Sequence, residues 1–184
     1  MTLDEIYSKY QSLNLAGLNG SSEKFVPGDG PCPAKLMIIG EAPGEQEDII
    51  GLPFQGPSGR LLNRLLENAG SKREEVFVTN IFKYRPPENR TPFPSEIIPS
   101  LPCLSAEIKC VDPEVIILAG RTATQAVFPA KSVRQLRGKL IPKGNRFVVC
   151  TYHPAAMIRS PQSKSMALLR RDIKLAVQSV GKAR

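Results

Sequence analysis

The chain has 184 residues, of which 41% are hydrophobic, and this length and composition predict a single domain with one buried core. No run approaches the roughly 18 apolar residues of a membrane span, and Asp4 and Glu5 are unlike an export signal, so we expect a soluble, cytoplasmic protein without a membrane partner. The net charge is +8, and from Arg121 onward fourteen Lys or Arg face a single acid, Asp172, which favours a nucleic-acid partner over a merely solvated basic surface.

Apolar spacing predicts the first elements and the strands. A short amphipathic helix opens an N-terminal segment of residues 1–33, because Leu3, Ile6, Tyr7 and Tyr10 follow helical spacing. The Gly- and Pro-rich stretch at 27–33 predicts a loop. Four short apolar runs are typical of buried strands, and these are Lys35–Gly40, Val76–Ile81, Val115–Gly120 and Phe147–Thr151.

Helical patterns lie between these strands. In the clearest one, Pro57 stands near the start, Gly70 marks the end, and the apolar stripe consists of Leu61, Leu62, Leu65 and Leu66. A last helix carries an apolar face of Leu169, Ile173, Ala176 and Val177. The stretch from Pro94 to Cys110 is not assigned, because Pro99 and Pro102 would interrupt a helix there.

Alternating strands and helices predict an α/β domain whose parallel sheet is covered on both faces. Ligands of such sheets bind beyond the carboxyl ends of the strands. Glu41-Ala42-Pro43-Gly44 follows the first strand, Asn80 ends the second, and Thr151-Tyr152-His153-Pro154 follows the fourth. These polar residues should therefore lie on one rim, where we expect the functional site.

The loop at residues 40–59 combines Gly and Pro with an unusual number of acids for a basic protein. Its carboxylates belong to Glu41, Glu45, Glu47 and Asp48. A solvated loop or caps for the following helix would explain them, but carboxylates beside a strand end can also activate water or stabilise a cation. The chain contains no G-x-x-x-x-G-K-[ST] motif, which excludes a P-loop NTPase.

Three further residues each allow a structural and a functional interpretation. His153 is the only histidine, and its place directly after a strand favours a catalytic or binding role over a structural one. Asn80 presents a donor and an acceptor, as reading an imide edge requires, although asparagine commonly ends strands. Phe54 would either stack on a base or plug the core. Met157 and Ile158 beside Arg159 would either pack normally or enter a base stack.

Three segments in order resemble the family 4 uracil-DNA glycosylases: GEAPGEQED with PFQGPSG, TNIFKYRPPENRTPFPSE, and TYHPAAMIRSP. The resemblance extends from about Lys35 to the final helix. It implies a four-stranded parallel sheet in an α/β/α sandwich, and base flipping followed by hydrolysis of the deoxyuridine N-glycosidic bond, which leaves an abasic site. It also implies a monomer acting on single- and double-stranded uracil-containing DNA, at the nucleoid if the source is prokaryotic. Two alternatives are a glycosylase for hypoxanthine or xanthine and a non-catalytic DNA-binding homologue.

The resemblance also implies roles for individual residues. Phe54 would stack on the flipped uracil, Asn80 would read its edge beside Ala42, and His153 would donate to uracil O2. Glu41, with Glu47 behind it, would serve the water and the cationic sugar. A strong general base is missing at Ala42, where family 1 has an aspartate. The residues implied in DNA binding are Ser58, Arg85, Asn89, Met157, Arg159 and Ser160, with Met157 to Pro161 forming a wedge loop in the minor groove.

Two negative expectations accompany these roles. Lys83 lies near Asn80, but its flanking residues suggest that it faces DNA, so we expect a monofunctional enzyme without a Schiff base.

The second concerns metal. Family 4 members usually hold a four-iron cluster on four cysteines, at positions that are Leu13, Ala16, Tyr84 and Ser100 here. We therefore expect no iron–sulfur cluster and no other metal. The actual cysteines form no C-x-x-C pair, and we expect buried free thiols without a disulfide at Cys32, Cys103, Cys110 and Cys150.

Overall fold

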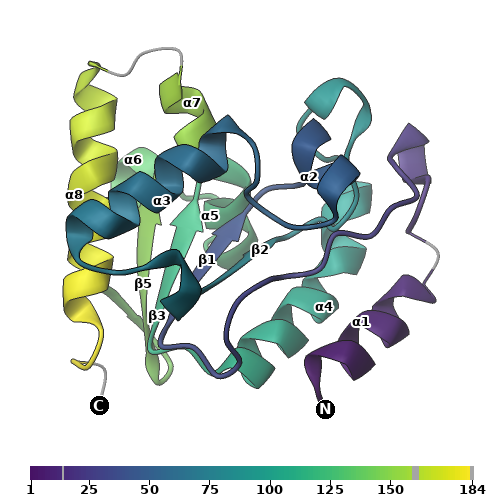
Figure 1. Cartoon of the computed structure of the whole chain (residues 1–184), viewed down its shortest axis with the longest axis horizontal. Helices are drawn as coiled ribbons and strands as arrows, with labels where there is room; N and C mark the ends of the chain where they lie inside the picture. Colours follow the sequence, from purple (N-terminus) through teal and green to yellow (C-terminus); the bar gives the residue numbers. More distant parts are fainter. Residues whose placement is uncertain (14, 159–161, 183–184) are drawn as a thin grey trace.

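A central β-sheet between two layers of helices forms the protein (Figure 1). The computed structural model describes residues 1–13, 15–158 and 162–182. The strands lie in the order β2-β1-β3-β5-β4. The first four of these pair in parallel, and β4 pairs antiparallel with β5. The strands are β1 (Leu36–Gly40), β2 (Val76–Asn80), β3 (Val115–Ala119), β4 (Ile141–Lys143) and β5 (Arg146–Thr151).

The α/β sandwich and the four parallel strands are confirmed, and every predicted strand end lies within one residue of the observed end. The expected number of strands is wrong by one, because β4 adds an antiparallel edge strand. This strand has three residues, with Pro142 in the middle, and no buried side chain. It therefore lacks the apolar run that marks the other strands, and proline is tolerated there because the strand lies at an edge.

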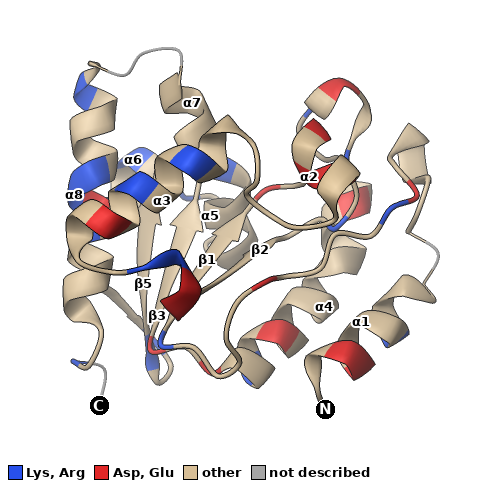
Figure 2. Cartoon of the chain, in the orientation of Figure 1, with Lys and Arg blue, Asp and Glu red and all other residues tan. Residues whose placement is uncertain are grey.

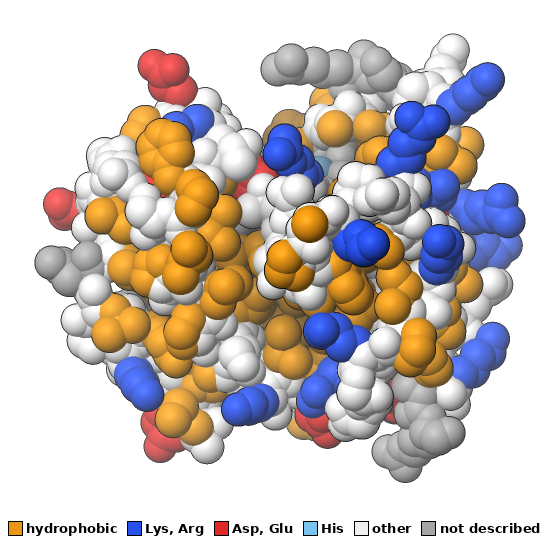
Figure 3. All heavy atoms as spheres, turned by 180° about the vertical axis from the view of Figure 1, so that it is seen from behind, with side chains coloured by type: hydrophobic (Ala, Val, Ile, Leu, Met, Phe, Trp, Pro, Cys, Tyr) orange, Lys and Arg blue, Asp and Glu red, His pale blue; other side chains and the backbone are white. Residues whose placement is uncertain are grey.

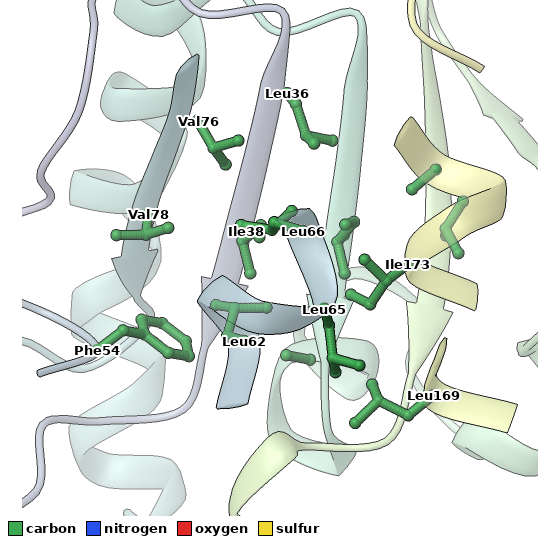
Figure 4. Close-up of a cluster of buried hydrophobic side chains, with 14 of the residues drawn as sticks. Leu36, Ile38, Phe54, Leu62, Leu65, Leu66, Val76, Val78, Leu169 and Ile173 are labelled. Carbon is green, nitrogen blue, oxygen red and sulfur yellow. The ribbon is translucent and has the colours of Figure 1, made fainter. Parts of the chain in front are cut away.

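Helices cover the sheet because the parallel strands bury side chains on both faces. The helices are α1 (Leu3–Gln11), α2 (Glu45–Ile50), α3 (Pro57–Ala69), α4 (Pro94–Val111), α5 (Arg121–Val127), α6 (Val133–Leu136), α7 (Pro154–Ile158) and α8 (Lys164–Ser179). Short 3₁₀ turns occur at Leu18–Gly20, Arg73–Glu75 and Pro87–Asn89. On one face, Leu36 and Ile38 of β1 join the core beneath α3 and α8 (Figure 4). On the other, Met37 and Ile39 pack with residues of α4 and α5.

Helix α4 runs unbroken through Pro99 and Pro102, contrary to the expected interruption. Each proline removes a hydrogen bond to the carbonyl four residues earlier, in Ser95 and in Ile98. Both of these residues are exposed, so water can hydrate the freed carbonyls. The opposite face of the helix is anchored by buried side chains, which are Glu96, Ser100, Cys103, Leu104, Glu107 and Val111.

A buried polar network joins α1, β2 and α4. The Lys83 Nζ lies 2.7 Å from both carboxylate oxygens of Glu107, and the two side chains are 2% and 0% exposed. The Tyr7 hydroxyl donates to Glu107 Oε1 at 2.8 Å, and the Thr79 hydroxyl lies 3.1 Å from the same oxygen. Lys83 therefore faces the interior, and the expectation that it faces DNA is wrong. The chain turns inward after β2, and the sequence neighbours of Lys83 do not indicate this turn.

Two of the four cysteines are more accessible than expected. Cys103 and Cys150 are buried, but Cys32 is exposed and Cys110 is half-buried. All four are free thiols, and the sulfur atoms of Cys32 and Cys110 lie 3.3 Å apart. Burial raises the pKa of the Cys103 thiol to about 12 and that of Cys150 to about 11, so both stay protonated at neutral pH.

Basic residues gather on one side of the molecule. Figure 2 shows Lys and Arg along α8, on α3 and around α6, whereas acidic residues lie on α1, α3 and α4 and on and beside α2. The view from behind likewise has most of its Lys and Arg over one half of the surface (Figure 3). Among the described helices, none combines the length and the apolar character that crossing a membrane would take.

Candidate functional site

Each of the three expected strand ends contributes residues to one pocket. It has a volume of about 330 Å³ and lies at the carboxyl ends of the parallel strands. Its lining comprises Glu41, Ala42, Pro43, Gly44, Glu47, Phe54, Ser58, Asn80, Pro86, Asn89, Arg90, Gly120, Arg121, His153, Ala155 and Ala156. Eight of the expected site residues are thus brought together from segments that are far apart in the sequence.

Glu47 organises the loop between β1 and α3. Its side chain is 7% exposed, and its carboxylate accepts the backbone N–H of Gly44 at 3.0 Å and those of Gln55 and Gly56 at 2.7 Å each. The first bond caps α2, and the other two hold the end of the loop. Three bonds occupy most of the roughly four acceptor positions of a carboxylate. The alternative of a helix cap therefore fits Glu47 better than a direct catalytic role.

The Glu47 loop places Phe54 in the pocket at the cost of an unusual backbone conformation. Phe54 has φ = +57°, which is unfavourable for a bulky residue, and its side chain is 6% exposed. The backbone of Phe54 lies against α3, where a Cβ on Gly59 would be 1.6 Å from its carbonyl oxygen. Only glycine at position 59 permits this approach.

Asn80 and Phe54 converge over Gly40. A Cβ on Gly40 would lie 2.4 Å from Asn80 Oδ1 and 2.8 Å from the Phe54 ring. The absence of a side chain at this strand end therefore creates the space in which the amide and the ring meet. Asn80 is 4% exposed, and its amide has no hydrogen-bond partner within the described part of the chain. An amide held at a pocket wall in this way is free to pair with a ligand.

His153 is held as a neutral ring with a defined tautomer. Burial lowers the pKa of His153 to about 4, although the nearby Glu47 carboxylate acts in the opposite direction. The backbone N–H of Ala155 donates to Nδ1 at 3.2 Å, so the proton of the neutral imidazole resides on Nε2. The ring lies nearly parallel to Phe54, with an interplanar angle of 19° and centroids 6.1 Å apart. Nε2–H is thus the donor that His153 offers.

We expect NMR to find the His153 pKa near 4 rather than near the ordinary value of about 6.5. Because His153 is the only histidine, its imidazole signals are assigned without ambiguity. Its lowered pKa means that the unfolded chain binds a proton more readily. Folding stability should therefore rise with pH between about 4 and 6.5 and lose this dependence above. The urea-unfolded chain, with a midpoint near 6.5, is the control, and an equal midpoint in the folded protein would contradict the burial argument.

The end of β3 supplies pocket residues that the sequence argument missed. Gly120 and Arg121 line the pocket, and the Thr122 hydroxyl donates to Glu41 Oε2. A Cβ on Gly120 would lie 3.0 Å from the His153 Cβ, so this turn also supports the histidine loop. The rule that ligands bind at strand ends applies equally to β3 and is the signal that would have found these residues.

Three of the residues expected to bind DNA, Ser58, Arg85 and Asn89, lie at or beside the pocket. Ser58 and Asn89 line the pocket, and Asn89 accepts a bond from Arg85 Nε at 2.9 Å. Arg85 itself lies beside the pocket, and its guanidinium is 3.8 Å from the Glu45 carboxylate. The pocket-lining Arg90 forms two 2.8 Å bonds to the buried Glu96 carboxylate, which fixes this turn.

The structure separates the two apolar residues expected in the wedge loop. Met157 is 7% exposed and joins the core with α3 and α8, whereas its neighbour Ile158 is 43% exposed. A side chain buried in the core cannot enter a base stack, so Ile158 replaces Met157 as the outward apolar side chain. Arg159 and Ser160, together with Pro161, lie outside the described residues.

The positions of the family's cluster ligands do not fit an iron–sulfur centre. Tyr84 is 2% exposed and packs against the rings of Phe25 and Phe82, and the hydroxyl of buried Ser100 donates to a backbone carbonyl at 2.7 Å. Leu13 is 48% exposed, and Ala16 is half-buried. Across residues 1–13, 15–158 and 162–182, no three His, Cys, Asp or Glu side chains are grouped as a metal would require. Thiolates are the ligands such clusters need, and these positions carry none.

Comparisons with known proteins support a common origin for this pocket. A sequence model of the Uracil DNA glycosylase superfamily matches residues 27–174, a range that includes every pocket-lining residue. A Type-4 uracil-DNA glycosylase of Saccharolobus solfataricus is 44% identical over 169 residues, which cover 86% of this chain and 78% of the relative. One from Thermotoga maritima is 36% identical over 183 residues, which cover 98% and 95%. One from Archaeoglobus fulgidus is 35% identical over 170 residues, which cover 88% and 85%.

Proposed function

The chain belongs to the uracil DNA glycosylase superfamily, and from this premise we propose that it is a DNA-repair enzyme that hydrolyses the bond between uracil and deoxyribose in DNA. The observation that carries the proposal is the meeting of Glu41, Asn80 and His153 in one pocket of about 330 Å³. The pocket volume lies within the range of small-ligand sites. A base reaches such a pocket only when it is flipped out of the stack.

Asn80 and Phe54 recognise the flipped base. The Asn80 amide offers a donor to uracil O4 and an acceptor to N3–H, and the Phe54 ring provides a surface for stacking. Ala42 lines the same pocket with a small side chain. The amide complements the O4 and N3–H edge of uracil, and because hypoxanthine and xanthine present a comparable carbonyl and N–H pair, the excision assay below is the test that separates the three bases.

His153 and Glu41 stabilise the two charges that develop as the bond between uracil and deoxyribose breaks. Uracil leaves as an anion, and the Nε2–H of the neutral His153 ring donates to O2, where negative charge accumulates. The sugar becomes cationic, and the Glu41 carboxylate stabilises it and orients the attacking water. Ala42 contributes no carboxylate, and Glu47 is occupied by backbone N–H groups, so Glu41 is the acid best suited to this role.

The reaction ends at an abasic site, because no amine is available for covalent chemistry at the Lys83 position. Lys83 is 2% exposed and paired with Glu107, which supports a monofunctional enzyme. The exposed Ile158 is assigned to enter the base stack near the flipped nucleotide. The proposal includes action as a monomer in the cytoplasm, on single- and double-stranded DNA, as the family resemblance implies.

An excision assay tests this function. Oligonucleotides carrying uracil, hypoxanthine or xanthine are incubated with the protein, and alkali then cleaves any abasic product. Cleavage of the uracil strand alone is expected. Cleavage confined to the purine substrates would favour a glycosylase for another deaminated base. Binding of uracil DNA without cleavage of any strand would favour a non-catalytic DNA-binding homologue.

Purified protein is expected to contain no iron–sulfur cluster, because the four family ligand positions carry Leu13, Ala16, Tyr84 and Ser100. The measurement is iron content per chain, together with the visible absorption spectrum. Protein purified without oxygen serves as the control, because it excludes oxidative loss of a cluster. About four irons per chain with a visible band in that sample would overturn the expectation.

A further inference from the structure

The residue Thr122 has no part in the function proposed above, yet it contacts the central carboxylate. Thr122 is the second residue of α5 and is 7% exposed. Its Oγ1 donates to Glu41 Oε2, across 81 residues of sequence. Within the described ranges this is the one hydrogen bond to the Glu41 carboxylate, so Oε1 is left to face a ligand.

The backbone around Thr122 is fixed from two directions. The N–H of Gly120 donates to the Thr151 carbonyl of β5 at 2.8 Å, and the Gly120 carbonyl accepts the N–H of Thr124 at 3.1 Å. Gly120 has φ = +93°, a conformation that glycine adopts readily, and a Cβ at this position would lie 3.0 Å from the His153 Cβ. The Thr122 hydroxyl therefore projects from a rigid turn between β3 and α5. A residue that supports a functional group needs such a rigid position.

We propose that Thr122 is a positioning residue that holds the Glu41 carboxylate in the orientation needed for hydrolysis. The inference rests on the proposed function and names a residue that acts through Glu41 rather than on the DNA. Anchoring Oε2 fixes the plane of the carboxylate, so Oε1 keeps one direction relative to the water and the sugar. The hydroxyl is neutral and leaves the negative charge of Glu41 intact for the cationic sugar.

The effect should appear in the chemical step and not in binding. A hydrogen bond to a charged group contributes about 1.5 kcal/mol or more, which corresponds to a rate change of about 10-fold or more. A carboxylate displaced by about 1 Å loses about 100-fold. We therefore expect Thr122→Val to slow single-turnover uracil excision by about 10- to 100-fold. Affinity for DNA carrying a hydrolysis-resistant 2′-fluoro-deoxyuridine should change by less than about threefold.

Two further variants separate the hydroxyl from packing. Thr122→Ser keeps the donor but loses the methyl group, and should excise within about threefold of the parental rate. Thr124→Val is the matched control, because Thr124 is fully buried on the same helix and makes no hydrogen bond to Glu41 in the described chain. It should excise at the parental rate. A slow Ser variant beside a fast Val variant would show that packing matters instead, and would overturn the inference.

A double-mutant cycle tests whether Thr122 acts through Glu41. In a Glu41→Gln background, Thr122→Val should slow excision by less than about twofold further, because the carboxylate it orients is gone. Full additivity of the two substitutions would overturn the inference. Equal rates for the parent and Thr122→Val would do so as well, while leaving the proposed function intact. Only a parent protein that excises no uracil would overturn both together.

Discussion

Replacing Asn80 by aspartate is expected to slow uracil excision by about 100-fold or more while changing DNA affinity by less than about threefold. The substitution keeps the shape and the acceptor toward N3–H but turns the donor toward O4 into a second acceptor. It also places a charge at a wall where Asn80 is 4% exposed. Single-turnover excision and binding of hydrolysis-resistant DNA, measured side by side, check the prediction.

Asn145→Asp is the matched control for this charge change. Asn145 lies exposed in the turn between β4 and β5, at the end of the sheet away from the pocket. Its variant should excise uracil at the parental rate. Parental activity in the Asn80→Asp protein would show that Asn80 does not read the base.

The largest effect on stability is expected from Lys83→Met, which leaves the buried Glu107 carboxylate without its cation. Removing one partner of a buried ion pair typically costs about 3–5 kcal/mol in the free energy of unfolding. The Tyr7 hydroxyl and the Thr79 hydroxyl remain within reach of Glu107, but neither neutralises its charge. Urea unfolding followed by circular dichroism measures the loss.

A double variant and a surface variant complete this test. Lys83→Met combined with Glu107→Gln removes both charges and should be more stable than Lys83→Met alone. Lys35→Met removes a lysine that is 71% exposed and 3.6 Å from Glu114, and should cost at most about 1 kcal/mol. Equal losses in the free energy of unfolding for Lys83→Met and Lys35→Met would refute the importance of the buried pair.

The sequence was sufficient to predict the parallel strands and the residues that meet at the centre of the pocket. The four parallel strands are apolar on both faces, so the apolar runs in the sequence are enough to locate them. Glu41 directly follows β1, Asn80 ends β2 and His153 is the second residue after β5, and parallel strands bring such residues to one edge. The same rule applied to β3 would have added Arg121 and Thr122.

Other features depend on the direction in which a side chain points, and the sequence pattern does not indicate that direction. Met157 and Ile158 are adjacent apolar residues, and only the packing of α7 against α3 decides which one is buried. Lys83 lies between pocket residues in sequence but turns into the interior. The sequence places Glu47 near Glu41 but does not indicate the three backbone N–H groups that its carboxylate accepts.

The four strand ends that form the pocket are synthesised at different times. Glu41 leaves the ribosome early, but His153 belongs to the last parallel strand end, and α8 must still pack on α3 afterwards. A nascent chain that carries only β1 and β2 therefore lacks His153 and the Nε2–H donor that this residue offers to the pocket. The pocket is therefore complete only once β5 has joined the sheet, and a chain that ends before this strand lacks one of the pocket walls.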